Sequence, residues 1–174
     1  GTQFCPGVVV QVNHGPLKRL FVSMPAAGQV AAVDTETFKV AANIDAGPEP
    51  TRIVMQPDGR YLWVGNNPRD GKAGGVTVID VRDQKVVMQA VTGRGHHEIA
   101  LSADSRTAFV TNRDDNTVTV FDTGTLNKVK DIEVGAMPLS VAYSALSRAA
   151  YVSNGKDGSI TVIDGTRLET LKTI

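Results

Sequence analysis

Short apolar runs recur along the whole chain, and a polar turn separates each run from the next. In one stretch, four such runs fall at about 97–102, 106–111, 117–122 and 128–134. Valine, isoleucine and threonine are frequent in them, and no stretch keeps the 3.6-residue period of an amphipathic helix. The pattern therefore predicts short β-strands joined by tight turns, and it predicts no long helix.

One of these runs opens with an aromatic residue and occurs four times. The phrases "FVSM", "WVGN", "FVTN" and "YVSN" begin at Phe21, Trp63, Phe109 and Tyr151. A second anchor is an aspartate that closes the following run, at Asp34, Asp80, Asp122 and Asp164. A third anchor lies ahead of each aromatic phrase, at Pro6, Pro50, His96 and Pro138. Three anchors that recur together indicate an internal repeat of about 42 residues.

Each repeat holds four strand-like runs, as a blade of a β-propeller does. We therefore predict an all-β fold of four-stranded antiparallel blades, four of them in this chain. The whole chain, 1–174, is then a single propeller domain or a segment of one. We place its blades at about 5–46, 47–92, 93–134 and 135–174. The second repeat is longer by an insertion between its anchors, in "NNPRDGKAGG" (66–75).

The third and fourth repeats also resemble a known family. "AFVTNRDDNTVTVFDTGTLNKVKDIEVG" and "AYVSNGKDGSITVID" are similar to YVTN-type β-propeller repeats. That family is itself similar to cytochrome d1-like and lactonase-like propellers. The first repeat departs from the motif, because Met24 stands where the family has Asn. The resemblance implies the fold and leaves function open, since propellers host many unrelated activities.

Propellers of this family commonly have about seven blades. Four blades leave three arrangements open. The chain can be an open segment of a larger propeller, it can pair with a second copy so that eight blades close, or it can close a four-bladed ring. An open array would expose apolar blade faces and favour association.

Charge and cysteine content limit the kinds of partner that we expect. Lys plus Arg and Asp plus Glu both number 18, so we expect no nucleic-acid partner. No apolar run approaches the roughly 18 residues of a membrane span, so we expect no membrane insertion. Cys5 is the single cysteine, so an internal disulfide is impossible and either redox compartment is compatible. The resemblance implies a periplasmic or cell-surface location. Expected partners are a protein, a small ligand, another copy or further blades.

The topology of a four-stranded meander gathers the longer loops on one face, which is where binding is expected. The sharpest departure from the repeat there is His96, which replaces proline and is followed by His97. Arg52 and Glu98 share one slot in adjacent repeats and predict an ion pair between blades or a contact at the channel mouth. With Arg94, these residues are the candidate ligand-binding set. The two histidines are also weak candidates for a metal.

Sequence motifs for catalysis are missing. "GxSxG", "HExxH" and the haem-attachment motif "CxxCH" do not occur, and no catalytic residue is assigned. Cys5, Met137 and His96 would make a copper-type set only if separate blades brought them together. The main hypothesis is a non-catalytic scaffold that binds a protein or small ligand on the loop-rich face. The alternatives are a cytochrome d1-like haem- or metal-binding propeller and a lactonase-like hydrolase, so enzymatic activity and the cofactor both stay undetermined.

Overall fold

The computed structural model describes residues 9–14, 17–95 and 97–174, which form four antiparallel sheets of four strands each. The first sheet contains β1 (Val9–His14), β2 (Leu17–Met24), β3 (Gln29–Asp34) and β4 (Val40–Asp45). The second contains β5 (Pro50–Met55), β6 (Tyr61–Asn66), β7 (Ala73–Asp80) and β8 (Lys85–Arg94). The third contains β9 (Ile99–Leu101), β10 (Thr107–Asn112), β11 (Thr117–Asp122) and β12 (Lys128–Glu133). The fourth contains β13 (Pro138–Ser144), β14 (Ala149–Asn154), β15 (Ser159–Asp164) and β16 (Thr170–Thr173).

Strands pair in chain order within every sheet, so each sheet is a simple meander. The helical content of the described residues is one 3-10 turn, η1, at Pro25–Ala27. In the third sheet, the strands lie within about two residues of the runs expected from the hydrophobic pattern. The predicted all-β architecture of four-stranded blades is confirmed.

The repeated aspartate forms the turn between the third and fourth strands. Asp34 Oδ1 accepts hydrogen bonds from the backbone N–H groups of Glu36 and Thr37, both at 2.9 Å, and equivalent bonds form at the other three aspartates. The fourth residue after each aspartate has a positive φ between 54° and 60°, although none is a glycine; these residues are Phe38, Gln84, Leu126 and Leu168. The carboxylate thus fixes a turn that strains the backbone slightly.

The sheets pack face to face through the aromatic residue on the second strand of the first, second and third sheets. Phe21, Trp63 and Phe109 are fully buried, and each lies in a hydrophobic cluster shared with the next sheet along the chain. Trp63 meets Phe121 of the third sheet with ring centroids 5.6 Å apart. The fourth member of the set, Tyr151, remains 36% exposed. Packing by whole apolar faces is what makes the sheets stack as blades.

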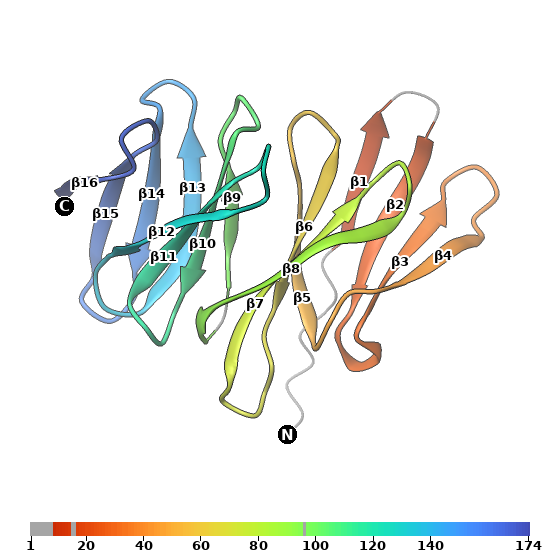
Figure 1. Cartoon of the computed structure of the whole chain (residues 1–174), viewed down its shortest axis with the longest axis horizontal. Coiled ribbons are helices and arrows are strands. Elements are labelled where there is room, and N and C mark those ends of the chain that lie inside the picture. Colours follow the sequence, from red (N-terminus) through yellow and green to blue (C-terminus); the bar gives the residue numbers. More distant parts are fainter. Residues whose placement is uncertain (1–8, 15–16, 96) are drawn as a thin grey trace.

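The four sheets follow one another in an open arc, with the first and the fourth at its two ends (Figure 1). The three hydrophobic clusters of the described residues join the first sheet to the second, the second to the third and the third to the fourth. The chain therefore does not close the four-bladed ring considered above. The open arrangement is compatible both with a segment of a larger propeller and with pairing of two copies.

Acid should weaken the aspartate turns. Backbone N–H groups of Thr37 and Glu36 hold the pKa of Asp34 at about 2, below its ordinary value near 4. The lowered pKa means that this contribution to stability is complete above about pH 4 and is lost as the pH falls through 2. In acid unfolding followed by circular dichroism, Asp34→Asn should lose less stability than the wild type between pH 5 and pH 2. Exposed Glu169→Gln should track the wild type, and an equal acid response of Asp34→Asn and wild type would contradict the role assigned to the turn.

Candidate functional site

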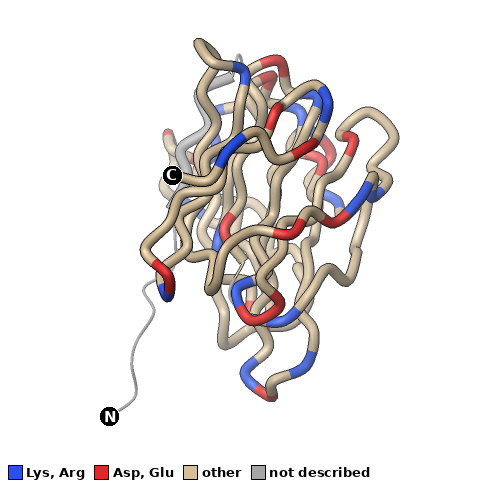
Figure 2. The backbone as a smooth tube through the Cα atoms, turned by 90° about the vertical axis from the view of Figure 1, so that its left-hand side faces the viewer, with Lys and Arg blue, Asp and Glu red and all other residues tan. Residues whose placement is uncertain are grey.

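The longer loops gather at one end of the arc, the lower end in Figure 1. We call this end the loop-rich face; it carries the links that enter β5, β9 and β13 and the links between the second and third strands of each sheet. In the view of Figure 2, Lys and Arg positions are interspersed with Asp and Glu positions along the backbone.

Of the two neighbouring histidines predicted on this face, the structure describes His97, and its side chain is fully buried. Its Nδ1 lies 2.8 Å from the carbonyl oxygen of Thr111, while the backbone N–H of Glu98 donates to Thr111 Oγ1 at 2.9 Å. The imidazole packs against Gly74, where even a Cβ atom would overlap its Nε2. His97 thus joins the second sheet to the third from inside and does not lie at the loop surface. His96 lies outside the described residues.

Two ion pairs tie the same two sheets together at their loop ends. Arg52 Nε lies 3.0 Å from Glu98 Oε2, as the shared slot predicted. Arg94 holds Asp115 through its side chain, at 2.7 and 2.8 Å, and through its backbone N–H, at 2.8 Å. The backbone N–H of Arg94, followed by its guanidinium, lowers the pKa of the Asp115 carboxyl. The structure therefore brings Arg52, Arg94, His97 and Glu98 together around the link into β9; that they bind a ligand stays a prediction.

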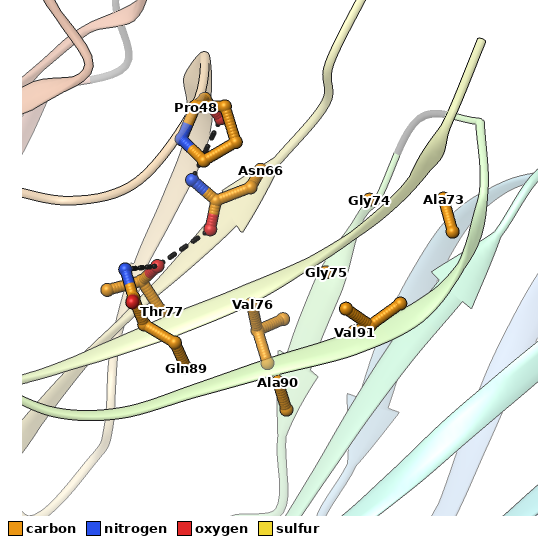
Figure 3. A pocket seen from close by; sticks show the side chains of 10 residues that line it. All are labelled: Pro48, Asn66, Ala73, Gly74, Gly75, Val76, Thr77, Gln89, Ala90 and Val91. Carbon is orange, nitrogen blue, oxygen red and sulfur yellow. Dashed lines mark hydrogen bonds between the residues drawn. The ribbon is translucent and has the colours of Figure 1, made fainter.

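A pocket of about 210 Å³ opens beside this link, on the other side of Gly74 (Figure 3). The insertion contributes part of its lining: residues 69–73 are exposed, and the buried glycines Gly74 and Gly75 lie near the start of strand β7. A Cβ atom on Gly75 would overlap the carbonyl oxygen of Ala90 on β8, so only glycine permits this approach. The lining residues are Pro48, Asn66, Ala73, Gly74, Gly75, Val76, Thr77, Gln89, Ala90 and Val91.

A chain of hydrogen bonds orders the polar wall of the pocket. The Asn66 amide donates to the carbonyl oxygens of Ala46 and Pro48 at 2.7 and 3.0 Å, and Asn66 Oδ1 accepts from Thr77 Oγ1 at 2.8 Å. Gln89 Nε2 in turn donates to Thr77 Oγ1 at 3.4 Å. The opposite wall is aliphatic, and none of the lining residues is ionisable. Such a site suits a small neutral group and offers no general acid or base.

The opposite face, where only short turns were expected, also carries two cavities. One of about 410 Å³ lies between the second and third sheets, and one of about 280 Å³ lies between the third and fourth. Arg60 and Arg106 line the first, and Arg148 lines the second. These arginines occupy the same position of the repeat, in "PDGR", "ADSR" and "ALSR". A repeated arginine in this turn is the sequence signal from which arginine-lined cavities on this face could have been predicted.

The described residues contain no group of three His, Cys, Asp or Glu side chains placed to hold a metal ion. His97 uses its Nδ1 on Thr111 and is not among the linings of the three cavities. Met137 is 39% exposed, and its two partners in the copper-type set, Cys5 and His96, lie outside the described residues. No helix within the described part could span a membrane.

Comparison with known proteins points to one family. A family model described as "Cytochrome D1 heme domain" matches residues 16–140, which hold strands β2 to β12 and the link with Arg94 and His97. No protein with a curated function matches. Among solved structures, 1042 chains match. The architecture is therefore widespread and by itself says little about activity.

One similar solved structure is the hydrazine synthase of Kuenenia stuttgartiensis. It is 25% identical, with a TM-score of 0.76 over 89% of this chain. The matched region is 45% of that protein's chain, so the present chain spans less than half of its length. The likeness supports the propeller-type arrangement of the sheets.

Replacing Gly74 should disturb the loop-rich face more than an ordinary surface change. In Gly74→Ala, the new methyl group would overlap the carbonyl oxygen of Asn66 and Nε2 of His97, so we expect a loss of about 1–3 kcal/mol in the free energy of urea unfolding. Gly124→Ala is the matched control, because its Cβ would meet only Asp122 Oδ1, at 3.3 Å, and should cost less than about 0.5 kcal/mol. Equal costs for the two variants would show that His97 and Asn66 give way without strain.

Proposed function

The chain belongs to the cytochrome D1 heme domain family, and from this premise we propose that it is part of a haem-handling β-propeller. In this proposal its described sheets form the scaffold of the cofactor face and do not ligate the iron. The observation that carries the proposal is the extent of the family match, which includes both strands and loops of the loop-rich face.

The polar groups of the loop-rich face suit the edge of a haem. Haem carries carboxylate side chains, and arginine binds a carboxylate through paired, charge-assisted hydrogen bonds. Arg52 and Arg94 already hold carboxylates, those of Glu98 and Asp115, and their side chains are 39% and 60% exposed. A ligand carboxylate could replace either partner without first burying a charge. The iron of a bound haem would supply redox or ligand-binding chemistry; we assign this chain no step at the metal.

The proposal that these sheets act as a scaffold rests on the contacts that the residues of the loop-rich face make. His97 and the Arg52–Glu98 pair hold the second sheet against the third, and the pocket beside Gly74 offers amide and aliphatic groups. These features position a face rather than perform proton transfer. They favour a non-catalytic contribution from this chain to a larger propeller.

Two finer assignments accompany the proposal. The phrases "FVTN" and "YVSN" support a relation of the repeats to the YVTN type. A periplasmic or cell-surface location follows from that same likeness. Both stay proposals, as does the division of the chain into blades at 47, 93 and 135.

Titration with ferric haem (hemin), followed by the Soret absorbance, tests the proposal. We expect saturable binding by the full chain, and we expect the double variant Arg52→Ala with Arg94→Ala to bind at least tenfold more weakly, about 1.4 kcal/mol. His97→Gln should leave the Soret maximum in place, because His97 is buried and bonded to Thr111.

The control is a second pair of arginines with the same total charge change. Arg106→Ala with Arg148→Ala removes two arginines from the opposite face and should change the affinity less than twofold. The proposal fails if the wild type shows no saturable Soret change, or if the control pair weakens binding as much as the loop-face pair does.

A further inference from the structure

The larger cavity of the opposite face, of about 410 Å³, lies where turns of the second and third sheets meet. Its lining falls within residues 56–60, 104–106 and 122–124, and we call it the turn cavity. Cavities of about 300–1,000 Å³ are the size that holds small molecules. None of the lining belongs to the loop-rich face, so the turn cavity is separate from the groups that we assign to haem.

Three buried polar side chains, those of Gln56, Ser105 and Thr123, order the wall of the turn cavity. Gln56 Nε2 donates to both carboxylate oxygens of Asp58, at 3.0 and 3.1 Å, while Gln56 Oε1 accepts from Trp63 Nε1 at 3.0 Å. The backbone N–H of Asp58 donates to Ser105 Oγ at 2.9 Å. Thr123 Oγ1 donates to the carbonyl oxygen of Ser105. These bonds cross from the second sheet to the third and hold the lining in place before a ligand arrives.

Ser105 has a backbone conformation that glycine would adopt more easily. Its φ is 62°, in the left-handed region, and the equivalent residue of the preceding repeat is Gly59, with φ 74°. A Cβ atom makes this conformation unfavourable, but the serine supplies the hydroxyl that accepts from Asp58. In the fourth sheet, the equivalent Ser147 is exposed and accepts from Tyr151 of its own sheet. The bond between sheets therefore distinguishes the turn cavity from the smaller cavity beside it.

Two guanidinium groups line the turn cavity without a carboxylate partner. Arg60 and Arg106 occupy the same position of neighbouring repeats. Neither forms an ion pair with a described residue, in contrast to Arg52 and Arg94. The Arg60 guanidinium carbon lies 4.7 Å from the ring centroid of the buried Tyr61, a contact that holds the group without using its N–H donors. Both arginines can therefore bind a carboxylate through charge-assisted hydrogen bonds.

Carboxylates also line the turn cavity, and hydrogen bonds within the turns keep them ionised. Asp104 Oδ1 accepts from the Ser102 hydroxyl at 2.6 Å and from the N–H of Arg106 at 3.1 Å. Asp122 Oδ1 accepts from the N–H of Thr125 at 2.8 Å. The Ser102 hydroxyl lowers the pKa of the Asp104 carboxyl, and the Thr125 N–H lowers that of Asp122. The described residues place no hydrogen-bond donor on the Oδ2 atom of either carboxylate, so both can accept from a ligand.

The lining thus presents both signs of charge, two guanidinium groups and the three carboxylates of Asp58, Asp104 and Asp122. A simple anion would be attracted by the arginines and repelled by the carboxylates, and a simple cation would experience the reverse. We propose that the turn cavity binds a small zwitterion, an α-amino acid. Its carboxylate binds Arg60 and Arg106. Its ammonium group donates to the Oδ2 atoms of Asp104 and Asp122, so that one ligand pairs both sets of charges.

Titration of the 174-residue chain with L-alanine, followed by ¹H–¹⁵N NMR, tests this assignment. We expect saturable shifts of the amide signals of residues 58–60 and 104–106, whose N–H groups lie in the lining turns. L-Lactate has a hydroxyl in place of the ammonium group, and L-alaninamide lacks the carboxylate. Each should bind at least tenfold more weakly than L-alanine, because each leaves one set of charges in the cavity unpaired.

Arg60→Gln and Arg106→Gln should each weaken the binding of L-alanine at least tenfold. Both side chains are exposed, so circular dichroism should show an unchanged fold. The matched control is Arg148→Gln, at the same position of the next repeat, which lines the smaller cavity; it should bind L-alanine as the wild type does. The proposal is overturned by a lack of saturable shifts in the lining turns, by L-lactate binding as tightly as L-alanine, or by an equal effect of Arg148→Gln.

Discussion

Burial of one large apolar side chain between neighbouring sheets is the constraint on which the structure depends. A four-stranded meander cannot bury its own faces, so each sheet needs a neighbour to remove them from water. Phe21, Trp63 and Phe109 mark the centres of the three contacts that do so. In this stacking the links into the first strands and between the second and third strands lie at the same end of the arc.

The candidate site is a product of that stacking. Arg52 belongs to the second sheet, and Glu98 opens the link into the third; they meet because the sheets pack. His97 fills the space left between them, and the missing side chain of Gly74 makes room for its ring. The arrangement of these polar residues therefore depends on the packing of the second sheet against the third. Changes in the contact between the second and third sheets should reach the arginines that we assign to a ligand.

The sequence predicted the architecture well because the relevant signals are local and repeated. Four copies of an aromatic phrase and of an aspartate turn identify strands and turns without any knowledge of packing. The Arg52–Glu98 pair could also be foreseen, since equal slots of adjacent repeats lie side by side. The burial of His97 could not, because it depends on a glycine 23 positions away in an insertion that the other repeats lack. The cavities of the opposite face depend likewise on the spacing between sheets.

Nearest-neighbour packing also has a kinetic consequence. Each sheet is built from contiguous residues and is held by contacts with the sheets on either side, so opening one end need not open the other. The second and third sheets are covered on two sides, and the first and fourth on one. Their amide protons should accordingly exchange with solvent at different rates, slowest in β6 and β10 and fastest toward β16. Tyr151, which is 36% exposed, lies in the fourth sheet, where we expect this exchange to be fast.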